Sequence, residues 1–277
     1  ALGQNDLIEF IREKYGDRPG RVAFWGIDFD APETLSEKAI DFLGRVGGIS
    51  CRSTAQARRY TDVLGRSVSY HPDNAFCHPA GRKTEASTAG RKELGINLVP
   101  FTRVGIIPGQ DERKQSAAAA YRTAVRRALE AFREAGYAIT HVPFTPADKQ
   151  FAEEVLRGLD VAQAPFRDRP AEVIGQIAEF ERFIATRLHA HIFSVLAGTP
   201  FFSVAYAGKC ERLQEDLPIP PGARVRKADL LEDPNRCAEK IYEAEYVHVD
   251  EEKRAKLRQE ARRGLSSGLD IVRAQAN

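Results

Sequence analysis

The chain has 277 residues, of which 43% are hydrophobic and 29% are charged. Its 41 Lys and Arg stand against 39 Asp and Glu, so the chain has no net basic character and is not expected to bind nucleic acid at large. No apolar run reaches the roughly 18 residues that a membrane-spanning helix needs, so we expect no such helix. The N-terminus lacks a secretory signal pattern. We therefore expect a cytoplasmic protein, either free or peripheral at the inner face of the membrane.

The four cysteines argue against a structural metal site. Cys51, Cys77, Cys210 and Cys237 are scattered along the chain and form no CxxC pair, which structural zinc sites usually contain. We expect reduced thiols and no bound metal.

Apolar runs alternate with helical patterns in the first 78 residues. Helices are expected at 6–15, 33–43 and 53–64, and strands at 21–27, 48–51 and 67–71. The polar, Gly-containing stretch 79–95 has the composition of a linker. We place a domain boundary inside it, with a first domain and linker at 1–90 and a second domain at 91–277.

The pattern resumes after this linker. Strands are expected at 102–107, 137–144, 183–186 and 201–206, and helices at 112–135, 147–159, 171–180, 188–197, 235–245 and 250–272. Strands that alternate with helices indicate parallel sheets. We predict two doubly wound α/β domains, whose ligands bind beyond the carboxyl ends of the strands.

Common nucleotide and hydrolase motifs are missing from the sequence. There is no GxGxxG after a strand, no GK[ST] phosphate loop, no HExxH and no GxSxG. Dinucleotide, P-loop, zincin and hydrolase functions therefore lose their usual support.

Residues 185–209 contain the highest density of candidate functional residues. Arg187 and His189 lie where an expected strand is followed by a helix. Backbone N–H groups at such a turn favour an anion. By helical spacing, His189 falls inside the apolar arc and His191 on its flank, so we expect His189 to face inward. Two interpretations of His189 stay open, a buried core histidine and a residue that faces the cleft. Arg187 is either a cleft cation or part of a surface salt bridge.

The same segment resembles the polysaccharide pyruvyl transferase family. The similarity rests on the Arg187-Leu188-His189-Ala190 run, the Ala197-Gly198-Thr199-Pro200 turn and the downstream Lys209, with weaker matches around Arg52, Asp73 and Asp148. The resemblance implies two Rossmann-like domains in a glycosyltransferase-B-like architecture. Such proteins begin with further strands, so it also implies an incomplete N-terminal, acceptor-side domain.

The resemblance implies transfer of pyruvate from phosphoenolpyruvate to a saccharide, which forms a ketal on a cell-surface polysaccharide or a precursor, lipid-linked or free. A doubly anionic donor suits cations, and we expect Arg52, Arg187 and Lys209 to bind it without a cofactor. His189 is the expected general acid–base.

For several residues and for the function, the sequence leaves an alternative interpretation open. Asp73 is a supporting carboxylate or a turn cap, Asp148 is a second supporting carboxylate, and Trp25 stacks on a sugar or lies in the core. The rival arrangement pairs Arg187 with His191. The rival functions are a sugar transferase with a nucleotide-activated donor and a non-catalytic donor-half binding module.

Overall fold

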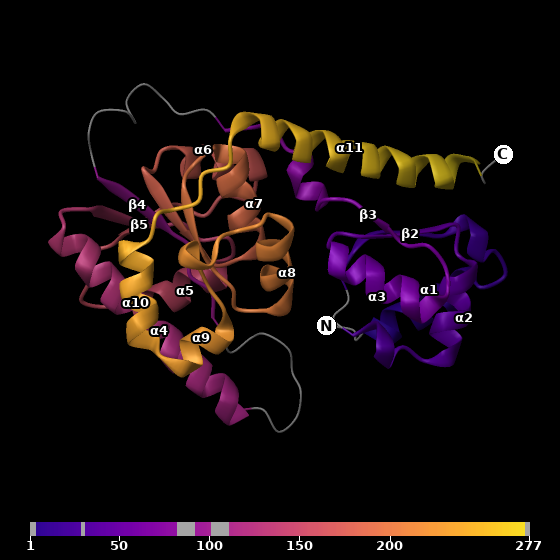
Figure 1. The fold of residues 1–277 in the computed structure, drawn as a ribbon, viewed down its shortest axis with the longest axis horizontal. Coiled ribbons are helices and arrows are strands. Elements are labelled where there is room, and N and C mark those ends of the chain that lie inside the picture. The colour runs from indigo at the N-terminus through magenta and orange to yellow at the C-terminus, as the bar shows by residue number, and fades with distance from the viewer. Residues whose placement is uncertain (1–3, 29–30, 82–91, 101–110, 275–277) are drawn as a thin grey trace. The chain divides into compact units, whose positions relative to one another are not determined.

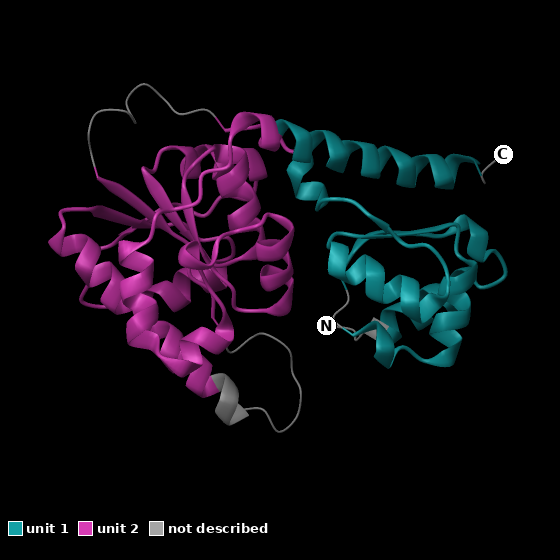
Figure 2. Ribbon diagram, in the orientation of Figure 1, with its two compact units in different colours: residues 1–77, 255–277 teal, residues 78–254 magenta. Residues whose placement is uncertain are grey.

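The computed structural model describes residues 4–28, 31–81, 92–100 and 111–274. These residues form two compact units, one of Ala1–Cys77 with Ala255–Asn277 and one of His78–Arg254 (Figure 2). The predicted strand at 102–107 lies outside the described residues.

Unit 1 is a three-stranded parallel sheet with helices on both faces (Figure 1). Its elements are α1 (Gln4–Tyr15), β1 (Ala23–Ile27), α2 (Glu37–Arg45), β2 (Gly48–Cys51), α3 (Thr54–Leu64), β3 (Ser69–Tyr70) and most of α11 (Glu251–Ala274). Ser36 and Ser53 cap α2 and α3 by accepting hydrogen bonds from the backbone three residues on, and Gly65 ends α3 in the left-handed conformation.

Alternating side chains of β1 separate the two faces of this sheet. Phe24 packs into the core with residues of α1, α2 and α3. Trp25 points the other way, where it stacks on His71 with ring centroids 5.5 Å apart and meets Gly268 of α11. Trp25 is therefore covered by this chain's own helix.

Unit 2 is a six-stranded parallel sheet in the order β6-β5-β4-β7-β8-β9. Its strands are β4 (Glu93–Ile96), β5 (Ala138–His141), β6 (Ala162–Gln163), β7 (Arg182–Ala185), β8 (Phe201–Val204) and β9 (Arg224–Val225). Its helices are α4 (Asp111–Glu134), α5 (Pro146–Val155), α6 (Pro170–Ala178), α7 (Leu188–Ala197), α8 (Gly208–Asp216), α9 (Lys227–Glu232) and α10 (Pro234–Glu243). The helices cover both faces of the sheet (Figure 1).

β4 lies at the centre of this sheet, between β5 and β7, although the sequence pattern assigned its residues to a linker. The strand is short and contains Gly95, a residue that usually weakens a strand. A Cβ atom at this position would lie 2.4 Å from the Phe183 ring and 2.5 Å from the Phe180 ring. The glycine is needed for this close approach, which sequence periodicity does not reveal.

The observed division of the chain differs from the predicted domains at 1–90 and 91–277. Unit 2 begins at His78, and residues 255–277 group with unit 1. The physical reason is the packing of α11, because Gly264 and Gly268 let the helix backbone approach the His71 and Trp25 rings.

Candidate active site

The strand order of unit 2 changes direction between β4 and β7. The chain runs from β4 outward to β6, then returns to start β7 on the other side of β4. In open parallel sheets, ligands bind at the carboxyl ends of the strands beside such a switch point. Asn97, directly after β4, bridges this position. Its Oδ1 accepts from the Arg187 backbone N–H at 3.0 Å, and its Nδ2 donates to the Val142 carbonyl at 3.1 Å.

Arg187 and Asp148 form an ion pair at this switch point. The Arg187 Nε atom donates to Asp148 Oδ2 at 2.7 Å, and Nη2 donates to Asp148 Oδ1 and to Thr145 Oγ1. Asp148 is fully buried and also accepts from the backbone N–H groups of Phe144 and Thr145 at 3.0 Å each. Asp148 therefore holds one edge of the guanidinium in place.

The environment of Arg187 keeps its charge. Burial alone lowers the pKa of this guanidinium, but the hydrogen bond and the charge of Asp148 outweigh burial and raise the pKa above its ordinary value. The described residues offer Nη1 no hydrogen bond. The side chain keeps 24% of its surface exposed.

His189 is exposed at the start of α7, so the expectation that it faces inward is wrong. The apolar arc fails as a guide because α7 is buried on almost every side, and a helix of that kind has no single inward face. The His189 ring stacks on Phe193 at 6.0 Å, one turn further along the helix. Phe193 also contacts Phe144 at 5.7 Å and His78 at 6.2 Å. Together these rings form an aromatic cluster at the start of α7.

His191 is fully buried. Burial lowers its pKa to about 4, although the bond to the Arg187 carbonyl acts in the opposite direction. A neutral, enclosed imidazole is a core group, which does not favour the rival arrangement of Arg187 with His191.

Lys209 and Tyr206 follow β8, the neighbour of β7 in the sheet. The Lys209 Nζ atom lies 5.6 Å from the centre of the Tyr206 ring, and Tyr206 is near enough to raise the pKa of Arg187. Lys209 is in the first turn of α8, and neither α7 nor α8 has a side-chain cap at its N-terminus. The structure thus gathers Asp148, Arg187, His189 and Lys209 at the carboxyl edge of this sheet.

Arg52 and Asp73 belong to unit 1, not to this group. Arg52 Nη1 donates to Asp73 Oδ2 at 2.8 Å, and its Nε and Nη2 donate to Asp28 Oδ2 at 3.2 Å each. Asp73 also accepts from the Ala75 backbone N–H at 2.9 Å, as a turn cap does. Two carboxylates surround one guanidinium, so this cluster carries a net negative charge.

Sequence reasoning missed four polar residues of these two sites. They are Asp28, Asn97, Thr145 and Tyr206. Each follows a parallel strand within a few residues, and that position was the signal available for Asp28, Thr145 and Tyr206. Asn97 could not be found this way because β4 itself was missed.

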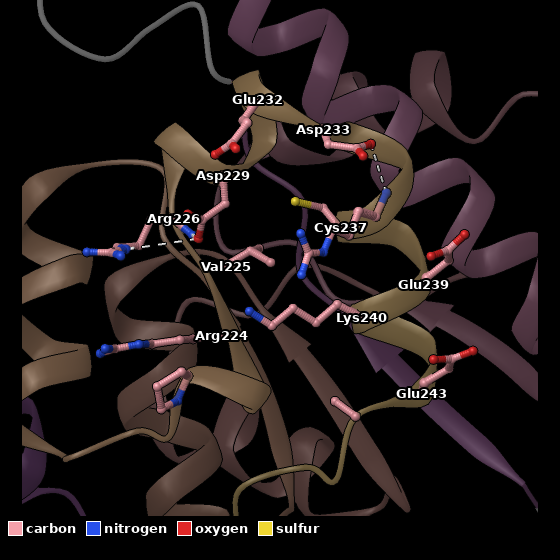
Figure 3. A pocket seen from close by; sticks show the side chains of 13 residues that line it. Arg224, Val225, Arg226, Asp229, Glu232, Asp233, Cys237, Glu239, Lys240 and Glu243 are labelled. Atoms are coloured by element: carbon pink, nitrogen blue, oxygen red, sulfur yellow. Dashed lines mark hydrogen bonds and ion pairs between the residues drawn. The ribbon is translucent and has the colours of Figure 1, made fainter.

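Other features of the described residues do not add to the site. No group of three or more His, Cys, Asp or Glu in the described part of the chain is arranged to hold a metal ion, and no helix there is long and apolar enough to cross a membrane. A cavity of about 910 Å³ lies beside β9, α9 and α10 (Figure 3). Basic and acidic side chains are mixed around it, among them Arg224, Lys240 and Glu243, and no predicted site residue lines it.

A protein-family model matches part of the chain. The family model described as polysaccharide pyruvyl transferase matches residues 128–208, which confirms the resemblance expected from the sequence. The matched stretch contains Asp148, Arg187 and His189 and ends one residue before Lys209. Among proteins with curated functions, none matches this sequence.

Similar solved structures extend over nearly the whole chain. A UDP-forming α,α-trehalose-phosphate synthase from Burkholderia xenovorans has a TM-score of 0.56 at 15% identity, covering 98% of this chain and 72% of the other. The trehalose-6-phosphate synthase OtsA has a TM-score of 0.52 at 12% identity, covering 98% and 69%. An E. coli trehalose-6-phosphate protein bound with UDP-2-fluoro glucose also has a TM-score of 0.52 at 12% identity, covering 98% and 70%. These similarities show the fold and confirm two Rossmann-like domains of glycosyltransferase-B type.

Proposed function

We propose that the protein transfers a pyruvyl group from phosphoenolpyruvate to two hydroxyls of a saccharide, with release of phosphate. The family match and the fold indicate a transferase. The observation that carries the finer proposal is the edge formed by α7 and α8. Two helix N-termini without side-chain caps begin beside Arg187 and Lys209, and such N-termini stabilise anions.

The donor carries a carboxylate and a phosphate, so it needs more than one cation. In the proposed complex, Arg187 contributes Nη1 and Lys209 contributes Nζ, while the first backbone N–H groups of α7 and α8 face the remaining oxygens. Asp148 holds the Arg187 guanidinium through Nε and Nη2. Its role here is to orient Arg187 rather than to touch the donor.

His189 is the proposed general acid–base. It lies two residues after Arg187, it is exposed, and no other exposed histidine lies in the first turn of α7. The imidazolium gives a proton to the methylene carbon of the donor, one sugar hydroxyl adds to the neighbouring carbon, and phosphate leaves with the proton of that hydroxyl. The second hydroxyl closes the ketal, and its proton returns to the imidazole.

We assign Arg52, with Asp28 and Asp73, to the saccharide and not to the donor. A guanidinium already balanced by two carboxylates gains little from a doubly charged anion. The same cluster offers donors and acceptors that sugar hydroxyls can use. An Arg52→Gln variant should therefore weaken the binding of the saccharide more than the binding of phosphoenolpyruvate.

Thermal unfolding with added ligand tests the donor. A ligand at 100 times its dissociation constant stabilises a protein by about 2.7 kcal/mol, so phosphoenolpyruvate should raise the melting temperature measurably. Arg187→Lys should lose most of this shift, because lysine cannot make the forked contact. Arg182→Lys is the matched control, because Arg182 lies at the other end of β7, beside Glu181.

The rival donor is a nucleotide-activated sugar, favoured by the similarity to UDP-forming synthases. Protection by UDP-glucose without protection by phosphoenolpyruvate would replace our proposal with this one. Protection by phosphoenolpyruvate without any phosphate release in the presence of saccharides would favour the binding module.

A further inference from the structure

One face of α11 combines apolar and cationic side chains in contact with solvent. Leu265, Leu269 and Val272 keep 39%, 48% and 46% of their surface exposed. At about 100° per residue they occupy an arc of roughly 60°. The residues that pack α11 against unit 1 lie outside this arc; they are Leu257, Ala261, Gly264 and Gly268.

The cations of α11 are not spread evenly around the helix. Arg258 falls about 20° from Leu265, within the apolar arc, and Arg262 and Arg273 fall beside the arc, at about 60° and 80° from Leu265 in the same rotational direction. Glu260 and Asp270 lie about 140° away from Leu265, on other faces of the helix. Within residues 255–274, the charged side chains that lie within about 80° of Leu265 are therefore all arginines, and one of them, Arg273, also pairs with Asp270 at 3.8 Å.

A hollow lies next to the apolar arc and is lined by two of these cations, Arg258 and Arg262. Its volume is about 500 Å³, and its lining includes Arg258, Arg262 and Arg263 from successive turns of α11. Arginine side chains suit phosphate groups because the planar guanidinium can donate two parallel hydrogen bonds. The Nε atom of Arg258 is enclosed and has no hydrogen-bond partner among the described residues.

We propose that this face of α11 docks on an anionic lipid surface. The apolar arc enters the boundary between headgroups and acyl chains, and the arginines contact lipid phosphates, as in interfacial amphipathic helices. The segment 255–274 is about 30 Å long, so it lies along the surface without crossing it. The charge of the face selects this occupant over an uncharged apolar partner.

Vesicle co-sedimentation of the intact chain tests the proposal. The chain should sediment with vesicles of phosphatidylcholine and phosphatidylglycerol, and far less with phosphatidylcholine alone. Binding should weaken as salt is raised, because the attraction to anionic lipid is screened. Equal binding to both vesicles, or none to either, would overturn the proposal. Catalysis does not enter this measurement, so its outcome is independent of the proposed function.

Charge variants locate the surface. Arg262→Gln with Arg273→Gln should weaken vesicle binding about 25-fold, at roughly fivefold for each cation removed. The matched control is Lys38→Gln with Arg58→Gln, which removes the same charge from exposed positions of α2 and α3. These helices pack on the opposite face of the sheet in unit 1 (Figure 1). Equal losses in the two pairs would overturn the assignment to α11.

Apolar variants separate docking from simple charge attraction. Leu265→Ser with Leu269→Ser should weaken binding at least tenfold, while Leu231→Ser, at an equally exposed position of α9, should not. Circular dichroism checks that α11 stays helical. If light scattering instead shows a dimer that the Leu265/Leu269 pair dissociates and that vesicles do not disrupt, the face joins two copies and the lipid proposal fails.

Discussion

The Nδ1 atom of His191 lies 2.7 Å from the carbonyl oxygen of Arg187, one helical turn earlier. A carbonyl only accepts hydrogen bonds, so Nδ1 carries the proton and Nε2 accepts from the Ser203 hydroxyl at 2.7 Å. Gln214 Nε2 in turn donates to Ser203 Oγ at 2.7 Å. This buried chain connects the backbone of Arg187 to β8 and α8, and burial keeps its imidazole neutral by lowering the pKa to about 4.

A neutral His191 makes the stability of the protein depend on pH. Its folded-state pKa, about 4, lies below the unfolded value of 6.5. The unfolded chain therefore takes up protons first, and stability is full above the unfolded value and lost as the pH falls toward 4. The loss is about 3 kcal/mol for this residue. Urea unfolding at neutral pH and near pH 4, the folded-state pKa, measures this loss of stability.

Two other histidines act in the same direction and must be separated from His191. Burial also lowers the pKa of His71 and of His141. We expect His191→Gln to reduce the pH dependence by more than His71→Gln does, because His191 is the more deeply buried of the two. An unchanged pH dependence in His191→Gln would show that the imidazole is not kept neutral by the fold.

Asp148→Asn tests the orientation of Arg187. The substitution keeps the size of the side chain but removes the charge that the guanidinium contacts at Nε and Nη2. Hydrogen bonds to charged groups contribute about 1.5–3 kcal/mol, so we expect a loss of stability in that range. We also expect a higher KM for phosphoenolpyruvate. A variant with normal KM and reduced stability would mean that Asp148 supports only the fold.

His189→Asn tests the acid–base assignment. The side chain is exposed and stacks on Phe193, and substitutions at exposed positions usually change the free energy of unfolding by about 0.5 kcal/mol or less. Turnover should fall by about 10²–10⁴. His191→Asn should behave in the opposite way, with a clear loss of stability. Normal turnover in a folded His189→Asn variant would contradict the mechanism.

Arg126→Ala should lower stability without affecting catalysis. Arg126 Nη1 donates to the carbonyls of Val155 and Arg157 at 2.6 and 3.0 Å, where α5 ends and those groups lack helical partners. We expect a loss of about 1 kcal/mol with unchanged kcat and KM. The control is Arg127→Ala, which removes the neighbouring arginine, a side chain that does not bond to the Val155 and Arg157 carbonyls. A large loss of turnover in either variant would place the cleft elsewhere.

The position of the candidate residues of unit 2 in the sheet could be predicted from the sequence more fully than the limits of the two units. Arg187 and Lys209 follow strong apolar strands, and the position of such residues at the carboxyl edge follows from parallel pairing alone. The exposure of His189 could not be predicted, because a helix that is buried on almost every side gives no sign of which face its first turn leaves open. The place of α11 depends on two glycines in a charged helix, and their role appears only beside the rings they contact.

Gly264→Ala tests this packing of α11 on unit 1. A Cβ atom at Gly264 would lie 2.5 Å from Cγ of His71, so the ring or the helix must shift. Alanine improves helix propensity by about 1 kcal/mol, but overpacking costs about 1–3 kcal/mol, and we expect a net loss of stability. Trp25 is the single tryptophan of the chain and stacks on His71, so its fluorescence should report the shift.

The matched control for this substitution is Gly175→Ala in α6. A Cβ atom there meets nothing within 4 Å, so only the gain in helix propensity remains, and stability should rise by about 0.5–1 kcal/mol. The opposite signs of the two glycine-to-alanine changes separate close packing from propensity. If both variants gain stability and the Trp25 emission is unchanged, α11 does not pack on the His71 ring through Gly264.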